Sequence, residues 1–208
     1  YSGINSLLAG SDDAELKEKY AEVSGHLPII KELADILYKN KKNRGCPELE
    51  TSESKLIIND EDICVGVERR TRGRSEEIIE DFMLVANECA ARFGMDNNLP
   101  FVYRIHEEPS DEKLESLREA LVKINVQYKL GEKAFPGDMS EILKAAKGTD
   151  IDLIMNNIVL RSMSKARYST EPVGHFGLAL EDYAHFTSPI RRYPDLTIHR
   201  IMSAFLSG

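Results

Sequence analysis

Residues 75 to 93 carry apolar side chains at the spacing of an α-helix, and this pattern limits the possible folds more than any other feature of the chain. The apolar positions are Ile79, Phe82, Met83, Ala86, Ala90 and Phe93. Side chains three and four positions apart share one face of a helix. The spacing therefore predicts one long amphipathic helix whose apolar face contacts a core.

An earlier helical region is expected between Ser11 and Leu37. Ser11 is a suitable N-cap because its hydroxyl can accept a hydrogen bond from the first turn. Gly25 and Pro28 predict a break or kink within the region. The basic run at 39 to 45 is expected to end the helix as a solvated loop, with RNA contact as the alternative.

The predicted strands are few. Two β-branched runs, at 55 to 59 and 63 to 67, are separated by three acidic residues and predict a hairpin. Phe101 to His106 is typical of a buried strand. The other expected helices cover 111 to 124, 138 to 147 and a segment opened by a Thr149–Asp152 capping box. The expected fold class is α+β, helix-rich with a small strand and hairpin component.

Composition fits one domain. The chain has 208 residues and a net charge of −8, which is not typical of a general nucleic-acid binder but still permits a basic channel. It contains neither an apolar run long enough to cross a membrane nor a signal-peptide pattern. The three cysteines, Cys46, Cys64 and Cys89, are odd in number and lack metal-ligand spacing. We therefore expect a reduced, cytoplasmic setting.

The segment from Thr187 to Asp195 has the composition of an anion-binding turn. Thr187 and Ser188 favour a local turn, and a helix is expected to begin near Pro194 with Asp195 in its first turn. Arg191 and Arg192 lie between this turn and the start of the helix. A guanidinium on a rigid turn can bind a phosphate through two N–H groups.

Neighbouring residues on an extended link point in different directions. We therefore expect one of Arg191 and Arg192 to face a ligand and the other a structural carboxylate. The alternative is that both are surface arginines with ordinary salt bridges, which are common and weak.

Three histidines, His175, His185 and His199, flank this segment. Their spacing matches no familiar zinc pattern, so structural hydrogen bonding is favoured over metal ligation. An acid–base site formed by the histidines with Asp195 remains the alternative.

Several ordered motifs resemble the ribonuclease II and ribonuclease R family, and within it the ribonuclease R branch. These motifs are IIEDFMLVAN at 78 to 87, RIHEEPS at 104 to 110, HFGLAL at 175 to 180, YAHFTSPIRRYPDL at 183 to 196 and HR at 199 to 200. They extend the resemblance over essentially the whole chain. It implies an enzyme that hydrolyses single-stranded RNA processively from the 3′ end and releases nucleoside 5′-monophosphates with Mg²⁺.

The family holds magnesium with an aspartate cluster located earlier in its catalytic domain. The aspartate pairs of this chain, 12 with 13, 60 with 62 and 150 with 152, do not reproduce the cluster spacing. Residues 1–208 are therefore expected to be the C-terminal half of the catalytic domain, inactive alone. Its expected partners are the N-terminal half, flanking OB-fold domains and the 3′ end of single-stranded RNA.

The resemblance also implies site residues. Arg191 is expected to neutralise the phosphate under attack, with Ser188 and Arg192 beside it at the RNA. Glu80 matches a glutamate of the family's active site, and Tyr1 matches a tyrosine that contacts RNA near the scissile phosphate. Leu49 stands where some members place a base-stacking phenylalanine, so this stacking contact is expected to be weaker.

Two further hypotheses belong to other classes of protein. One is a module that binds RNA without cleaving it, and the other is a structural domain whose acidic surface docks another protein. The assay that separates the three adds the intact protein to 3′-labelled RNA with magnesium. Monophosphate release would support the exoribonuclease, retained intact RNA would support the binding module, and absence of binding would support the structural domain.

Overall fold

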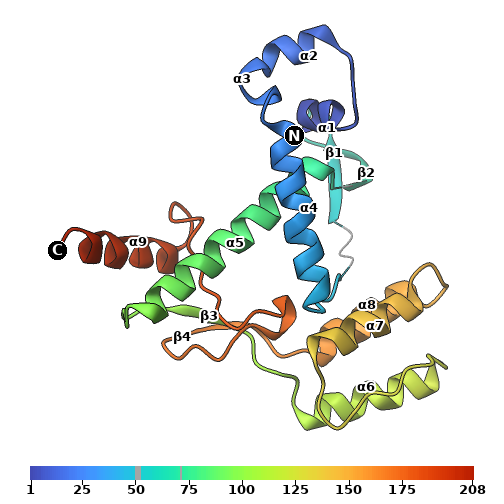
Figure 1. The fold of residues 1–208 in the computed structure, drawn as a ribbon. Coiled ribbons are helices and arrows are strands. Elements are labelled where there is room, and N and C mark those ends of the chain that lie inside the picture. Colours follow the sequence, from blue (N-terminus) through green and yellow to red (C-terminus); the bar gives the residue numbers. More distant parts are fainter. Residues whose placement is uncertain (50–52, 71) are drawn as a thin grey trace. The chain divides into compact units, whose positions relative to one another are not determined.

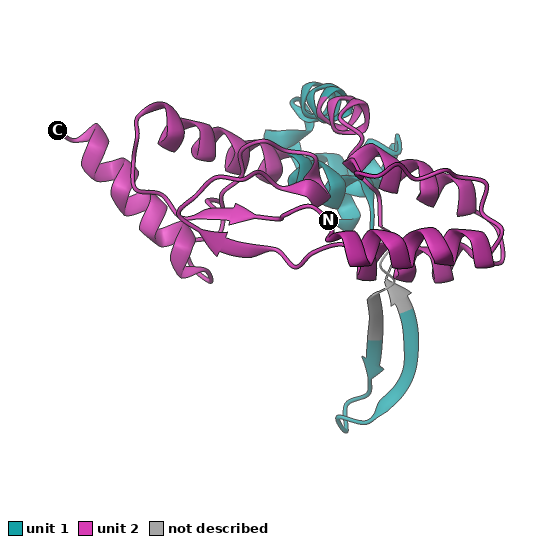
Figure 2. Ribbon diagram, turned by 90° about the horizontal axis from the view of Figure 1, so that it is seen from below, with its two compact units in different colours: residues 1–36, 50–81 teal, residues 37–49, 82–208 magenta. Residues whose placement is uncertain are grey.

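The computed structural model describes residues 1–49, 53–70 and 72–208, and it divides the chain into two compact units (Figure 2). Unit 1 comprises residues 1–36 and 50–81, and unit 2 comprises residues 37–49 and 82–208. The boundary falls inside two helices, so α4 and α5 each contribute residues to both units.

Unit 1 contains short helices and a hairpin. The elements that begin in it are α1 (Ser2–Leu8), α2 (Ala14–Lys19), α3 (Ala21–Ser24), α4 (Leu27–Asn43), β1 (Glu53–Ile58), β2 (Cys64–Arg70) and α5 (Arg74–Asp96). The predicted hairpin is confirmed: β1 pairs antiparallel with β2, with a register shift between Ile57 and Ile58. The break expected near Gly25 and Pro28 is also confirmed, because α3 ends at Ser24 and α4 begins at Leu27.

Unit 2 holds most of the fold. Its further elements are β3 (Tyr103–Ile105), α6 (Asp111–Lys123), α7 (Pro136–Ala146), α8 (Asp152–Ser162), β4 (Arg167–Ser169), a 3₁₀ turn η1 (Phe176–Leu178) and α9 (Tyr193–Leu206), all labelled or traceable in Figure 1. β3 and β4 form a short antiparallel pair. Helices joined to small antiparallel sheets confirm the predicted α+β class.

Two apolar clusters form the core of unit 2. In the first, α6, α7 and α8 pack together around the fully buried Met139, Ile142 and Met155. The second joins the end of α5, the strand β3 and α9 through Phe101, Ile105 and Ile198. This second cluster anchors both sides of the segment that contains Arg191.

Several predicted helix starts and ends are wrong, for local reasons. The basic run at 39 to 45 is helical as far as Asn43, since lysine and asparagine do not interrupt a helix that is already formed. Asp13, rather than Ser11, caps α2, and its carboxylate accepts hydrogen bonds from the N–H groups of Glu15 and Leu16.

Two other expectations about helices also need correction. Thr149 forms no capping box, because its hydroxyl donates to the carbonyl of Ala146 while the Asp152 carboxylate accepts from the N–H of Gly148. The apolar stripe of α5 is shifted at its start: Ile79 is 45% exposed, whereas Ile78 is buried. One step along a helix rotates a side chain by about 100°, so this shift changes the buried face.

Candidate phosphate-binding turn

The segment from Phe186 to Arg192 is a turn fixed at both ends by side chains of two helices. On the α5 side, the Asn87 amide oxygen accepts hydrogen bonds from the N–H groups of Phe186 (2.9 Å) and Thr187 (3.1 Å). On the α9 side, one carboxylate oxygen of Asp195 accepts from the N–H of Ser188 at 2.8 Å. The backbone of the turn is therefore bound to the core before it reaches the arginines.

Inside the turn, the carbonyl oxygen of Ser188 accepts from the N–H groups of Arg191 (3.2 Å) and Arg192 (3.0 Å). The helix α9 then begins at Tyr193, with Pro194 in its first turn as predicted. Pro189 within the turn has a restricted φ, which further limits its conformations.

The two arginines have different environments. The Arg192 guanidinium donates from Nε (3.1 Å) and from one terminal nitrogen (2.8 Å) to the same oxygen of Asp195. Asp195 is fully buried, and the Arg192 side chain is 18% exposed. The Arg191 side chain is exposed and makes no hydrogen bond or ion pair with the residues that the structure describes. The prediction that one arginine faces a structural carboxylate is therefore confirmed, and Arg192 is that arginine.

Exposed apolar side chains lie on either side of Arg191 in the sequence. Ile190 is fully exposed and Tyr193 is 72% exposed. A cation beside an exposed aromatic ring provides a charged contact and a stacking surface in one place.

The histidines near the turn form an aromatic series rather than a metal site. Ring contacts link His106 to His175 (5.0 Å), His175 to Tyr183 (5.2 Å) and Tyr183 to His185 (5.8 Å) between centroids. Nowhere in residues 1–49, 53–70 and 72–208 do three or more histidine, cysteine or acidic side chains gather as a possible metal site. The described residues therefore offer no cluster of three or more such ligands for a magnesium ion.

Hydrogen bonds favour structural roles for these rings. His106 bonds the carbonyl of Ser164 through Nε2 (2.7 Å), and its Nδ1 accepts from the N–H of Gly177 (2.9 Å). The Nε2–H tautomer satisfies both contacts with a neutral ring. Burial lowers the pKa of His106, in keeping with that neutral state.

His185 and His199 likewise bond groups other than Asp195. His185 Nδ1 lies 2.8 Å from the Tyr168 hydroxyl, and burial lowers its pKa to about 4. His199 Nε2 lies 2.9 Å from the carbonyl oxygen of Phe186 and its ring stacks on the Phe186 ring at 4.1 Å. The alternative of an acid–base site formed with Asp195 gains no support from these contacts.

The other predicted site residues are divided between the units. Leu49, in unit 2, is partly buried against the first apolar cluster. Glu80, in unit 1, is about half exposed and forms an ion pair with Arg72 at 3.2 Å. Tyr1, also in unit 1, is 64% exposed, and its carbonyl oxygen accepts from the N–H of Asn5 at the start of α1. Within unit 2, Ser188, Arg191 and Arg192 lie together on the turn.

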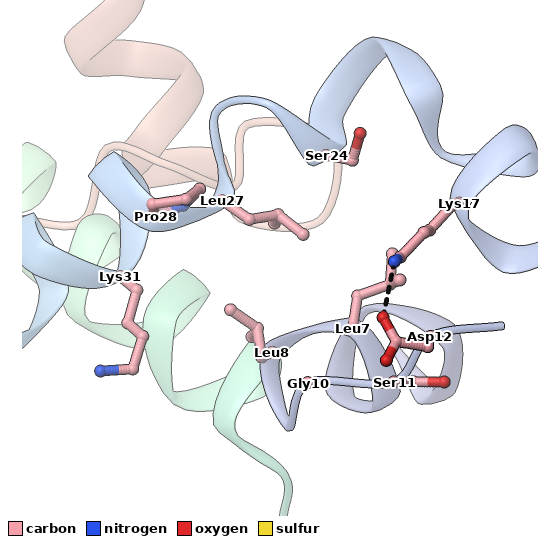
Figure 3. Close-up of a pocket in the computed structure, with 10 residues that line it drawn as sticks. All are labelled: Leu7, Leu8, Gly10, Ser11, Asp12, Lys17, Ser24, Leu27, Pro28 and Lys31. Carbon is pink, nitrogen blue, oxygen red and sulfur yellow. Dashed lines mark hydrogen bonds and ion pairs between the residues drawn. The ribbon is translucent and has the colours of Figure 1, made fainter. Parts of the chain in front are cut away.

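Unit 1 also has a pocket of about 490 Å³ (Figure 3). Leu8, Leu27 and Pro28 contribute apolar side chains to its lining. Its lysines are already paired, Lys17 with Asp12 (2.9 Å, dashed in Figure 3) and Lys31 with Asp35 beyond the lining. No predicted site residue lines the pocket, so the turn is the stronger candidate for an anion site.

Sequence reasoning missed two contributors. It did not predict that the Asn87 amide holds the turn. It also missed β4, whose Tyr168 bonds His185 and carries the Arg104 guanidinium over its ring at 4.9 Å. A buried asparagine on a helix face that is otherwise apolar was the available signal for Asn87.

Comparison with known proteins identifies the class of domain. The family model described as "RNB domain" matches residues 1–208, and the chain belongs to this family. Within the family, the chain is similar to proteins named ribonuclease R. Ribonuclease R 1 of Lactococcus lactis subsp. lactis (strain IL1403) is 40% identical over 209 residues, and Ribonuclease R of Escherichia coli (strain K12) is 39% identical over 207 residues. Each match covers 100% of this chain and 25% of the relative, so the chain spans about a quarter of their length.

Comparison with solved structures also finds similarity to a ribonuclease R. Mycoplasma genitalium RNase R in complex with double-stranded RNA superposes with a TM-score of 0.87 and 29% identity, covering 98% of this chain and 36% of that chain. Yeast Ssd1, described as a pseudonuclease, has a TM-score of 0.65 and 20% identity, covering 86% of this chain and 23% of that chain. At that identity the second likeness concerns the fold alone.

Proposed function

We propose that this chain is the phosphate-binding part of a processive 3′-to-5′ exoribonuclease that hydrolyses single-stranded RNA to nucleoside 5′-monophosphates. One observation carries the proposal: Arg191 is exposed on a turn held by two buried side chains, while Arg192 is engaged by Asp195. The names of the relatives support ribonuclease chemistry, and one solved neighbour is Mycoplasma genitalium RNase R in complex with ribose methylated single-stranded RNA.

In this proposal Arg191 binds the scissile phosphate. Negative charge grows on the phosphate oxygens as the phosphodiester is attacked, and a fixed guanidinium stabilises that charge more than it stabilises bound substrate. Because the turn is held before substrate arrives, its backbone does not have to reorganise during the reaction. Arg192 keeps the turn in place through Asp195, and its remaining N–H donors are available for the RNA backbone together with the Ser188 hydroxyl.

The metal ion of the reaction, expected to be magnesium, would be held by residues outside this chain. We propose that the remaining part of the same catalytic domain supplies them and that OB-fold domains guide RNA toward the turn. Tyr1 is proposed to contact the RNA near the scissile phosphate, and Glu80 is proposed to be an active-site residue that binds RNA. Leu49 is proposed to pack on a base with less stacking energy than an aromatic ring would give.

Replacing Arg191 tests the proposal. In the full-length protein that contains this chain, Arg191→Ala should lower kcat by roughly 100-fold or more, the scale on which loss of one transition-state donor acts. The dissociation constant for single-stranded RNA should change little, because many other phosphate contacts supply binding. The measurements are monophosphate release from 3′-labelled RNA at saturation and an equilibrium binding titration.

The matched control is Arg161→Ala, which removes an exposed arginine on α8. It should leave both kcat and the dissociation constant at the level of the unmodified protein. An Arg191→Ala protein that retains full activity would contradict the assignment and direct attention to Arg192.

A second candidate function is RNA binding without cleavage. The similarity of fold to yeast Ssd1, described as a pseudonuclease, is the observation that favours this second candidate. In that case the full-length protein would retain 3′-labelled RNA intact in the presence of magnesium, and Arg191→Ala would weaken binding instead of turnover.

A further inference from the structure

Asn87 makes three hydrogen bonds that join α5 to the candidate turn. Its side-chain oxygen accepts from the N–H groups of Phe186 and Thr187, and its side-chain nitrogen donates to the Tyr183 hydroxyl at 3.0 Å. Asn87 is 2% exposed and Tyr183 is 7% exposed. These bonds span 96 to 100 positions of sequence.

The accepted N–H groups belong to the two residues just before Ser188. Ser188 in turn donates its N–H to Asp195, and its carbonyl oxygen accepts from the N–H groups of Arg191 and Arg192. A continuous series of bonds therefore runs from the Asn87 oxygen to the backbone of Arg191. The Arg191 side chain has no described hydrogen bond of its own, so the turn backbone determines where its guanidinium can reach.

We propose that Asn87 is a positioning residue for Arg191, and this inference rests on the proposed function of the turn. Asparagine suits the position because one short side chain combines an oxygen with two lone pairs and an N–H donor. Loss of the oxygen leaves two partly buried N–H groups unpaired and allows the start of the turn to move. A displacement of about 1 Å at a catalytic group can lower the rate by roughly 100-fold.

The test compares two near-isosteric variants of the full-length protein that contains this chain. Asn87→Leu removes every hydrogen bond, whereas Asn87→Asp keeps an acceptor for Phe186 and Thr187, and the Tyr183 hydroxyl can then donate to the carboxylate. We expect Asn87→Leu to lower kcat by roughly 100-fold with little change in RNA affinity, and Asn87→Asp to recover most of that loss.

A double variant separates positioning from general damage. If Asn87 acts through Arg191, then adding Asn87→Leu to Arg191→Ala should lower kcat little further, because the group to be positioned is already absent. If the two substitutions acted independently, their fold losses of kcat would multiply in the double variant. That result would overturn the inference.

Two controls address folding. Asn156→Leu removes another buried asparagine of unit 2, whose amide bonds Asp152 within α8, and should lower the unfolding temperature without a 100-fold loss of kcat. Tyr183→Phe removes only the partner of the Asn87 nitrogen and should also spare kcat. If Asn87→Leu does not fold, Asn87→Ser takes its place, since the shorter hydroxyl cannot span both N–H groups.

The outcomes distinguish this inference from the proposed function. If Arg191→Ala keeps full activity, the proposed function fails. If Arg191→Ala is impaired while folded Asn87→Leu matches Asn156→Leu in kcat, only the positioning role of Asn87 fails. Loss of kcat in Asn87→Leu, recovery in Asn87→Asp and non-additivity with Arg191→Ala together support it.

Discussion

His175 illustrates how burial alone changes the chemistry of a single residue. Its Nδ1 is buried and has no hydrogen-bond partner among the residues that the structure describes, and its ring contacts those of His106 and Tyr183. Desolvation, followed by the nearby His106, lowers the pKa of His175 to about 3. We therefore expect the ring to be neutral in the folded protein near neutral pH.

A pH dependence of stability follows from this shift. In the unfolded chain His175 takes up a proton near its ordinary pKa of about 6.5, whereas the folded chain does not until about pH 3. Protonation thus favours the unfolded state, and the free energy of unfolding should fall as the pH drops from 6.5 toward 3. At pH 5 the contribution of His175 is on the order of 2 kcal/mol.

Urea denaturation at pH 7 and pH 5 measures the effect. His175→Phe keeps an aromatic ring at the position and should reduce the difference between the two pH values. An unchanged difference in the variant would show that other groups, His185 among them, carry the pH dependence.

At the residue scale, the sequence allowed us to predict that one of the two arginines faces a structural carboxylate, because neighbouring side chains on an extended link point in different directions. The hydrogen-bond partners of Asn87 could not be predicted from the sequence. Its bonds to Phe186 and Thr187 cross 99 and 100 positions, and no local pattern reports which backbone N–H groups a buried amide will meet. Contacts at such separation depend on how α5 and α9 pack.

At the scale of elements, periodicity predicted α5, and Pro194 with Asp195 predicted the start of α9, because both signals are local properties of the sequence. The ends were less predictable, since several capping groups compete within a few residues, as Asp13 and Ser11 do at α2. The strand β4 spans only Arg167–Ser169 and forms by pairing with β3, so its own sequence contains little signal.

The end of α4 shows a close approach between elements. Gly45 has a φ of +78°, and a Cβ added there would lie 2.8 Å from the Cα of Gly137 at the start of α7. Such a distance is shorter than a normal contact, so the two backbones can meet only where Gly45 lacks a side chain. Gly45 therefore limits the path that the chain can take directly after α4.

Two glycine-to-alanine substitutions separate the cost of backbone strain from the cost of a steric clash. Gly148 has a similar φ of +74° but open space around it. Gly148→Ala should cost roughly 1 kcal/mol because of the left-handed conformation alone. Gly45→Ala should destabilise the protein clearly more, because the methyl group also collides with Gly137. Equal losses in urea denaturation would contradict the close approach.

At the scale of the whole molecule, the residues that the sequence predicted for the site are distributed over both units. Arg191, Ser188 and Arg192 belong to unit 2, whereas Tyr1 and Glu80 belong to unit 1. Across residues 1–49, 53–70 and 72–208, no helix is both long and apolar enough to cross a membrane. The resemblance of sequence motifs predicted the family of the domain, but the division into two units has no sequence signal, since its boundary lies within continuous helices.

The isolated chain should not cleave RNA. The described residues provide no cluster of ligands for a metal ion, and phosphodiester hydrolysis in this proposal needs one. We therefore expect the purified 208-residue chain to release no nucleoside monophosphate from 3′-labelled RNA in magnesium. The control is the Arg191→Ala chain purified in the same way, which reports contaminating nuclease. Release above that control would contradict the prediction.

The cysteines give the molecule a ready-made pair of labelling positions. Cys46 is buried, its thiol contacts the carbonyl oxygens of Pro47 and Gly177, and burial raises its pKa, so it is a poor nucleophile. Cys64 and Cys89 are exposed, the first in unit 1 and the second in unit 2. Spin labels attached at neutral pH would therefore modify one thiol in each unit. Each label would report on the surroundings of its own unit when RNA is added, without any engineered cysteine.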